Sequence, residues 1–359
     1  MQEMQECKTA EMHRCRITTT AMRPGYHAFM SDQGRIVVHR HKSQVLEGNP
    51  LGDPTERDLH VYLPPDHARG RSYPCLLAVV GFTGTGGMLF NVDPLGEDLK
   101  RRLDRLITSG KCPPVIVVAP DCFTRLGGNQ YINSSATGRY EDYLLQEIVP
   151  FISSTYSTGR WGVFGKSSGG YGSIILGMRH PDVFEALADH SGDANFELCY
   201  LPDASEALDQ FREAGGPRAW LDRFWADDNR HRGKFQKALN FLAMSAHYSP
   251  NPDSPHLGID LPFDLETGEF RWDVWQRWME WDPVRLVERY ADNLRRLRLI
   301  YVDCGSKDEF TLHWGARALV AGMRRSGLSP VHEEFDDGHM SITYRYDVSL
   351  PLLARALSR

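Results

Sequence analysis

The stretch Arg160-Trp-Gly-Val-Phe-Gly-Lys-Ser-Ser-Gly-Gly-Tyr171 decides the fold. It begins with a short apolar run that predicts a strand, and the residues from Tyr171 to Met178 predict a helix. A strand that turns at once into a helix around Gly-x-Ser-x-Gly is the setting of a nucleophile elbow. A Cβ atom at Gly165 or Gly169 would collide with neighbouring backbone in so tight a turn. We therefore predict that Ser167 stands at the tip of the turn as a nucleophile. The alternative is a Gly/Ser loop that only connects the two elements.

The neighbouring serine has a different predicted role. Ser168 is the alternative nucleophile, but the position two residues before it is Lys166 and not glycine. We expect the Ser168 side chain to point away from the tip and its backbone N–H to serve as one donor of an oxyanion hole. The second donor is expected from the Gly-rich loop after the third strand, where Phe82 is our choice and Gly81 the alternative.

A serine hydroxyl needs a base, and the base needs an acid that fixes its tautomer. In this type of fold the chain order is Ser, then Asp or Glu, then His. Among the histidines after Ser167, His339 lies in a loop just past the last predicted strand, Val331 to Phe335. Loops at the carboxyl ends of such strands converge on the site. His339 is therefore the predicted base, and His190, at the end of the strand after the nucleophile helix, is the main alternative.

The predicted acid is Asp308, in the loop after the strand Leu299 to Asp303. Asp303 itself is still on the strand, and Glu309 is the neighbouring carboxylate. The alternative role of Asp308 is to cap the helix that follows it.

Strand and helix signals alternate over most of the chain, which predicts an α/β fold with a doubly wound, mostly parallel sheet. From about residue 196 to residue 292 the alternation stops, and the segment is rich in tryptophan and phenylalanine. We predict a core of residues 26–195 and 293–359, a helical cap insertion at 196–292, and a weakly ordered extension at 1–25. The cap aromatics either line an acyl or aryl pocket or form the cap's own core. Three residues on a strand-end loop, Arg125, Asn129 and Tyr131, either contact substrate or hold the loop.

The composition argues against several classes of protein and of binding site. The chain of 359 residues is 41% hydrophobic and carries a formal charge of −6, which disfavours nucleic-acid binding. Seven cysteines without CxxC spacing do not suggest a disulfide framework or a zinc ribbon. There is no HExxH or comparable pattern, so we expect no metal and no cofactor. No stretch has the character of a signal peptide or a membrane span, and we predict a cytoplasmic protein that does not bind membranes.

With these residues in hand, the chain resembles the putative esterase family, which includes enterochelin esterases, feruloyl esterases, S-formylglutathione hydrolase and the mycolyltransferase antigens. The matching segments are Gly165–Gly170, Cys304–Phe310, Phe335–His339 and the loop Asp121–Ser134. The resemblance covers about residues 55–355 without the insertion. It implies the α/β-hydrolase fold, an acyl-serine mechanism on a small-molecule ester, and the triad Ser167, Asp308 and His339.

The chain departs from that family in two places. The His-Gly that usually precedes the oxyanion loop is Val80-Gly81 here, and the insertion is longer and more aromatic than expected. Two other functions are compatible with the same motifs. One is acyl transfer to an alcohol in place of water, and the other is that of a non-catalytic binding protein on this fold. The sequence does not specify the ester, and it leaves the oligomeric state open, a homo-oligomer included.

Overall fold

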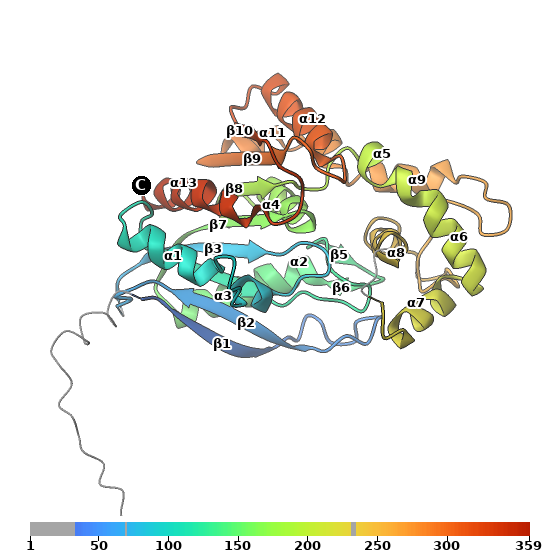
Figure 1. Ribbon diagram of the computed structural model, residues 1–359, viewed down its shortest axis with the longest axis horizontal. Coiled ribbons are helices and arrows are strands. Elements are labelled where there is room, and N and C mark those ends of the chain that lie inside the picture. The colour runs from blue at the N-terminus through green and yellow to red at the C-terminus, as the bar shows by residue number, and fades with distance from the viewer. Residues whose placement is uncertain (1–32, 69, 231–234) are drawn as a thin grey trace, which may run out of the picture.

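A computed structural model describes residues 33–68, 70–230 and 235–359 (Figure 1). Its core is an eight-stranded sheet in the order β1-β2-β4-β3-β7-β8-β9-β10. The pairs β1–β2 and β2–β4 are antiparallel, and every other neighbouring pair is parallel. This confirms the predicted mostly parallel sheet. The predicted extension at residues 1–25 lies outside the described residues.

Every strand predicted from the sequence is present. The strands of the large sheet are β1 (Arg35–Lys42), β2 (Glu56–Leu63), β3 (Tyr73–Val79), β4 (Ile116–Pro120), β7 (Thr158–Lys166), β8 (Phe184–His190), β9 (Leu299–Gly305) and β10 (Val331–Phe335). A separate small pair, β5 (Asn133–Ser134) and β6 (Gly138–Arg139), was not predicted, because two residues are too few to show alternation.

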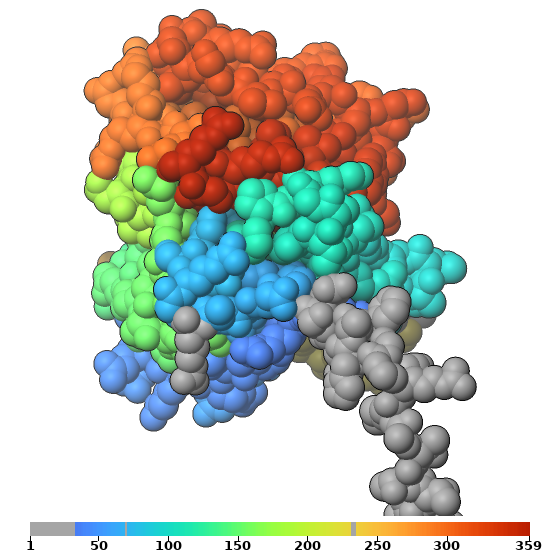
Figure 2. Space-filling view, turned by 90° about the vertical axis from the view of Figure 1, so that its left-hand side faces the viewer, coloured from blue at the N-terminus to red at the C-terminus, as the bar shows by residue number. Residues whose placement is uncertain are grey.

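Helices cover both faces of the sheet, which gives two separate apolar cores. One face is covered by α1 (Leu99–Thr108) and the closing helix α13 (Tyr346–Ser358). Figure 2 shows these two segments side by side, and ion pairs from Arg102 and Arg105 to Asp347 join them. The other face is covered by α2 (Tyr140–Asp142), the π-helical turn η2 (Tyr143–Ile148), α3 (Val149–Thr155), α4 (Ser168–Arg179) and α12 (Leu312–Arg325). Two short 3-10 helices, η1 (Gly86–Phe90) and η5 (Ile342–Arg345), complete this part of the chain.

The central strands are rich in apolar residues because both of their faces are covered. On β7, Trp161 and Val163 belong to one core and Phe164 belongs to the other. Side chains of β7 thus point alternately into the two cores, so the end of the strand before Ser167 has no face toward solvent.

Between β8 and β9 the described residues form a series of helices, most of which lie beyond the carboxyl ends of the parallel strands (Figure 1). They are α5 (Phe196–Cys199), η3 (Leu201–Asp203), α6 (Ala204–Ala214), α7 (Pro217–Ala226), α8 (Gln236–Tyr248), α9 (Trp272–Met279), α10 (Pro283–Leu286) and α11 (Ala291–Arg295). Trp220, Trp275 and Trp278 are buried among these helices, in the apolar core that continues under the sheet. These tryptophans are therefore core residues of the cap.

The first prediction concerns the close packing under the turn. A Cβ atom at Gly169 would lie 2.1 Å from the carbonyl oxygen of Val79, which is fixed in β3. We expect Gly169→Ala to lower the free energy of unfolding by about 3 kcal/mol or more, since backbone cannot move aside as a flexible side chain can. Urea denaturation measures this loss. Gly322→Ala, within α12, is the matched control. The atom nearest to its Cβ would be a side-chain nitrogen of Arg325 at 3.6 Å, and alanine favours a helix. Equal stability of the two variants would contradict the prediction.

Candidate active site

Ser167 stands between β7 and α4 with φ 60° and ψ −127°. Its N–H donates to the carbonyl oxygen of His190 (2.9 Å), and its own carbonyl accepts from Tyr171 N–H (2.9 Å). A Cβ atom at Gly165 would lie 2.4 Å from the carbonyl oxygens of Val79 and Gly169. A positive φ at a residue other than glycine costs on the order of 1–3 kcal/mol, and such strain concentrates at functional sites.

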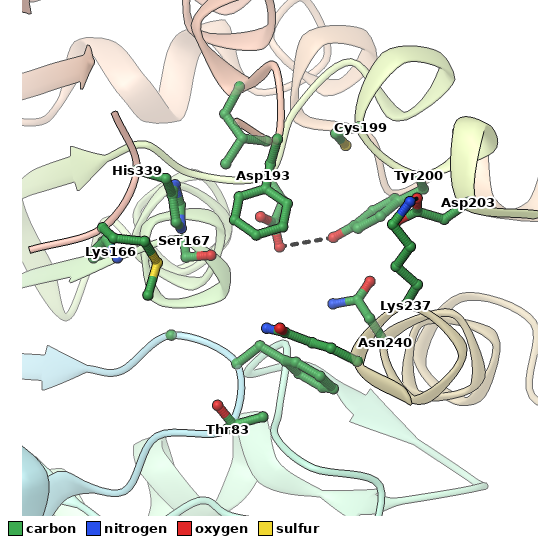
Figure 3. Close-up of a pocket in the computed structure, with 16 residues that line it drawn as sticks. Thr83, Lys166, Ser167, Asp193, Cys199, Tyr200, Asp203, Lys237, Asn240 and His339 are labelled. Atoms are coloured by element: carbon green, nitrogen blue, oxygen red, sulfur yellow. Dashed lines mark hydrogen bonds and ion pairs between the residues drawn. The ribbon is translucent and has the colours of Figure 1, made fainter. Parts of the chain in front are cut away.

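His339 and Asp308 come from the loops after β10 and β9, and the structure brings them together. The Nδ1 atom of His339 lies 2.8 Å from Oδ2 of Asp308, and both side chains are buried. Burial alone would raise the pKa of Asp308, but the His339 ring and the N–H groups of Phe310 and Leu312 hold that pKa below its usual value. Figure 3 shows the His339 ring beside the Ser167 side chain.

The two loops that carry this pair fit closely. A Cβ atom at Gly305 would lie 2.4 Å from the carbonyl oxygen of Gly338, so the end of β9 lies against the loop of His339. The N–H of His339 donates to Oε2 of Glu309 (2.7 Å). Glu309 therefore positions the backbone of His339, while Asp308 contacts its ring.

The alternative base, His190, has both ring nitrogens occupied within the core. Nδ1 lies 2.6 Å from Oδ1 of Asp303, and Nε2 lies 2.9 Å from Oγ of Ser349. The ring is fully buried and does not line the cavity at Ser167. His190 is a structural residue that joins β8, β9 and α13.

A cavity of about 250 Å³ opens above Ser167. The sheet side contributes Ser167, His339 and the loop from Gly81 to Thr83. The cap contributes mostly polar side chains, namely Tyr200, Asp203, Gln236, Lys237 and Asn240 (Figure 3). The only aromatic ring that the described part of the cap adds is that of Tyr200.

The two predicted oxyanion donors lie at this cavity's base. Phe82 lines the cavity, and the next amide, that of Thr83, donates to the carbonyl oxygen of Gly127 (2.7 Å). In the described residues no acceptor is recorded for the Phe82 amide. Ser168 is the first residue of α4, where a backbone N–H has no intrahelical acceptor. Its side chain turns away from the tip and donates to Oδ2 of Asp193 (3.1 Å).

The three predicted substrate contacts lie outside the cavity and hold loops instead. Arg125 pairs with Asp222 of the cap (3.2 Å). The side chain of Asn129 accepts from the N–H of Tyr131 (2.6 Å), and the Tyr131 hydroxyl donates to the carbonyl oxygen of Val80 (2.5 Å). Tyr131 thus fixes the loop that carries Phe82.

Sequence reasoning missed the cap residues and Asp193. The cap helices have ordinary amphipathic patterns, which do not indicate which polar residues face a cavity. Asp193 had a usable signal, since it follows the carboxyl end of β8 as closely as Asp308 follows β9.

The family model described as "Putative esterase" matches residues 54–326 of this chain. The chain therefore belongs to this esterase family and is a carboxylic-ester hydrolase, which confirms the resemblance seen in the sequence. A search of curated proteins found no significant match.

Solved structures show the same fold. A ferulic acid esterase is 20% identical over 90% of this chain and 99% of its own, with a TM-score of 0.57. An S-formylglutathione hydrolase from Agrobacterium tumefaciens is 18% identical over 90% and 96%, with a TM-score of 0.55. The fluorophosphonate-binding serine hydrolase FphF of Staphylococcus aureus is 14% identical over 91% and 98%, with a TM-score of 0.53. Within the described residues no helix has the length and apolar character needed to cross a bilayer.

The second prediction separates the two histidines. We expect His190→Ala to lower the free energy of unfolding by about 3 kcal/mol, because it leaves Asp303 buried with one partner fewer. Ester hydrolysis per folded molecule should stay within a few fold of the wild type. His339→Ala also leaves a buried carboxylate, Asp308, with one partner fewer, so a loss of stability is expected there too, but it should abolish hydrolysis per folded molecule. Thermal unfolding and an ester assay measure both effects, and a stable but inactive His190 variant would contradict the assignment.

Proposed function

We propose that this esterase cleaves its substrate through an acyl-serine intermediate on Ser167, with His339 as the base and Asp308 as the acid of the triad. The observation that carries the proposal is the buried Asp308–His339 pair, whose His339 ring lines one cavity with a serine held at a strained turn. A nucleophile, a base and an orienting carboxylate in this order are the parts that acyl transfer requires.

Asp308 sets the tautomer of the base. Its lowered pKa keeps it ionised, so it accepts a hydrogen bond from Nδ1–H of His339 and leaves the lone pair on Nε2 for the serine hydroxyl. As Ser167 Oγ attacks the ester carbonyl, His339 takes the hydroxyl proton. The Asp308 carboxylate then stabilises the imidazolium that forms.

The negative charge on the carbonyl oxygen is stabilised by the amides of Phe82 and Ser168 and by the positive end of the α4 dipole. Collapse of the tetrahedral intermediate expels the alcohol, which receives its proton from His339. Water then attacks the acyl-enzyme with His339 again as base, and the acid and free Ser167 are released.

We assign this chemistry to the core of residues 26–195 and 293–359, and substrate selection to the cap at 196–292. The cap residues at the cavity mouth support this division. We also propose a cytoplasmic location, which is supported by the five cysteines of the described residues, all of them free thiols.

The third prediction tests the nucleophile. We expect Ser167→Ala to lower kcat for a p-nitrophenyl ester by about 10³-fold or more and to abolish labelling by a fluorophosphonate probe, with the fold intact. Ser173→Ala is the control, since that hydroxyl is buried in the same helix and donates to the carbonyl oxygen of Gly170 (2.7 Å). The control should keep both activity and labelling. Labelling that persists in Ser167→Ala would overturn the assignment.

The fourth prediction tests the acid. Asp308→Asn should lower kcat by roughly 10³- to 10⁴-fold, because an amide in place of the carboxylate favours the wrong His339 tautomer. Asp336→Asn, in the adjacent loop, changes an exposed carboxylate that pairs with Lys307 and should leave kcat unchanged. A small effect of Asp308→Asn would assign the acid to another carboxylate.

A further inference from the structure

A carboxylate that the triad does not use lines the cavity of Ser167 and His339. Asp193 follows β8 in the segment Ser191-Gly-Asp193 and is only 6% exposed. Figure 3 shows it between the Ser167–His339 pair and Tyr200 of the cap. The mechanism proposed above does not use it.

The two oxygens of this carboxylate differ in their surroundings. Oδ2 accepts hydrogen bonds from the hydroxyl of Tyr200 (2.8 Å), the hydroxyl of Ser168 (3.1 Å) and the side-chain amide of Gln130 (3.3 Å). Oδ1 has no hydrogen-bond partner among the described residues. It is not completely enclosed by protein, so a ligand can reach it. Three donors thus fix the orientation of the carboxylate and leave Oδ1 open to the cavity.

Asp193 also lacks a counter-ion. In the described part of the chain no lysine, arginine or histidine nitrogen lies within 4.0 Å of it. Burial raises the pKa of Asp193 above its usual value, and the Tyr200 hydroxyl and the charge of the His339 ring offset part of that rise. A buried carboxylate without a cation is costly, and a cation that enters the cavity would lower that cost.

Neither lysine of this cavity is an ion-pair partner of Asp193. Lys237 Nζ lies 3.1 Å from Asp203 and 3.3 Å from Glu206. Lys166 makes no ion pair within 4.0 Å among the described residues, and the charges of Asp308 and Glu309 act on it from a longer distance. The carboxylate of Asp193 is therefore available to a cation of the ligand.

Aromatic rings complete the surroundings of this charge. Phe82, Tyr200 and Phe310 line the same cavity as Asp193. Aromatic faces attract cations, and a carboxylate among aromatic rings is a common setting for an ammonium group. A cavity of about 250 Å³ is at the small end for ligand sites, which limits how far such a group can lie from the ester.

We propose that Asp193 binds a positively charged amine of the substrate, so that this enzyme selects small esters that carry an ammonium group within a few bonds of the scissile carbonyl. The inference rests on the proposed function of Ser167, and it adds the substrate class.

Two pairs of isosteric esters test it, one for each side of the ester bond. Acetylcholine and 3,3-dimethylbutyl acetate differ in the charge of the alcohol, and methyl 3-aminopropanoate and methyl butanoate differ in the charge of the acyl group. Acid release at pH 7 is followed by titration. We expect kcat/KM of the wild type to favour the charged ester of at least one pair by about tenfold or more, the scale of one partly buried cation–π contact.

Asp193→Asn should remove that preference, so that kcat/KM becomes about equal for the charged ester and its neutral partner. Asp336→Asn is the control, an exposed carboxylate outside this cavity that pairs with Lys307, and it should keep the preference. A merely structural role of Asp193 would lower both members of a pair equally. Equal rates within both pairs for the wild type, or a preference that survives Asp193→Asn, would overturn the inference.

Two further measurements keep the test decisive. If Asp193→Asn does not fold, inhibition of the wild type by tetramethylammonium is compared with inhibition by tert-butanol, and stronger inhibition by the cation is expected. Equal inhibition would overturn the inference. Fluorophosphonate labelling of Ser167 separates the two proposals, because its absence contradicts the triad, whereas labelling without charge preference contradicts only the role of Asp193.

Discussion

The site depends on the contact between the end of β3 and the turn from β7 into α4. No side chain fits between them, since a Cβ atom at Gly165 or Gly169 would overlap the carbonyl oxygen of Val79. The same close contact places the loop with the proposed oxyanion donor beside the nucleophile, because a Cβ at Gly81 would lie only 3.3 Å from the Cβ of Ser167. The loop with the Phe82 amide and the strained serine are thus positioned by one backbone contact.

The parallel sheet supplies the remaining groups. β8, β9 and β10 are neighbours, and their carboxyl ends lie at one edge of the sheet. The loops after these strands carry Asp193, Asp308 and His339. Asp193 and His339 line one cavity, and Asp308 contacts the His339 ring. Ser167, from the next strand along, completes the row. The order of the strands therefore determines the order in which the side chains face the substrate.

This regularity is why much of the molecule could be predicted from the sequence. Buried strands have short apolar runs, and the tight turn requires glycines, so both are visible without a structure. The π-helical turn at Tyr143–Ile148 was not predicted, since its pattern is that of an ordinary amphipathic helix. Arg125, Asn129 and Tyr131 were predicted as substrate contacts from their place after a strand, but they bond to backbone and cap. Periodicity indicates burial, and it does not distinguish a loop support from a cavity wall.

Apolar and polar side chains of the cap lie in different places. Trp220, Trp275 and Trp278 pack into the core. Asp203, Lys237 and Asn240 face the cavity, so the cap presents polar groups to a substrate. It is also joined to the chemistry through Asp193, whose Oδ2 accepts from Tyr200 on the cap and from Ser168 in the turn. Ser168 contributes the proposed oxyanion amide. A ligand held by the other oxygen of Asp193 would therefore contact a side chain that links the cap to the nucleophile turn.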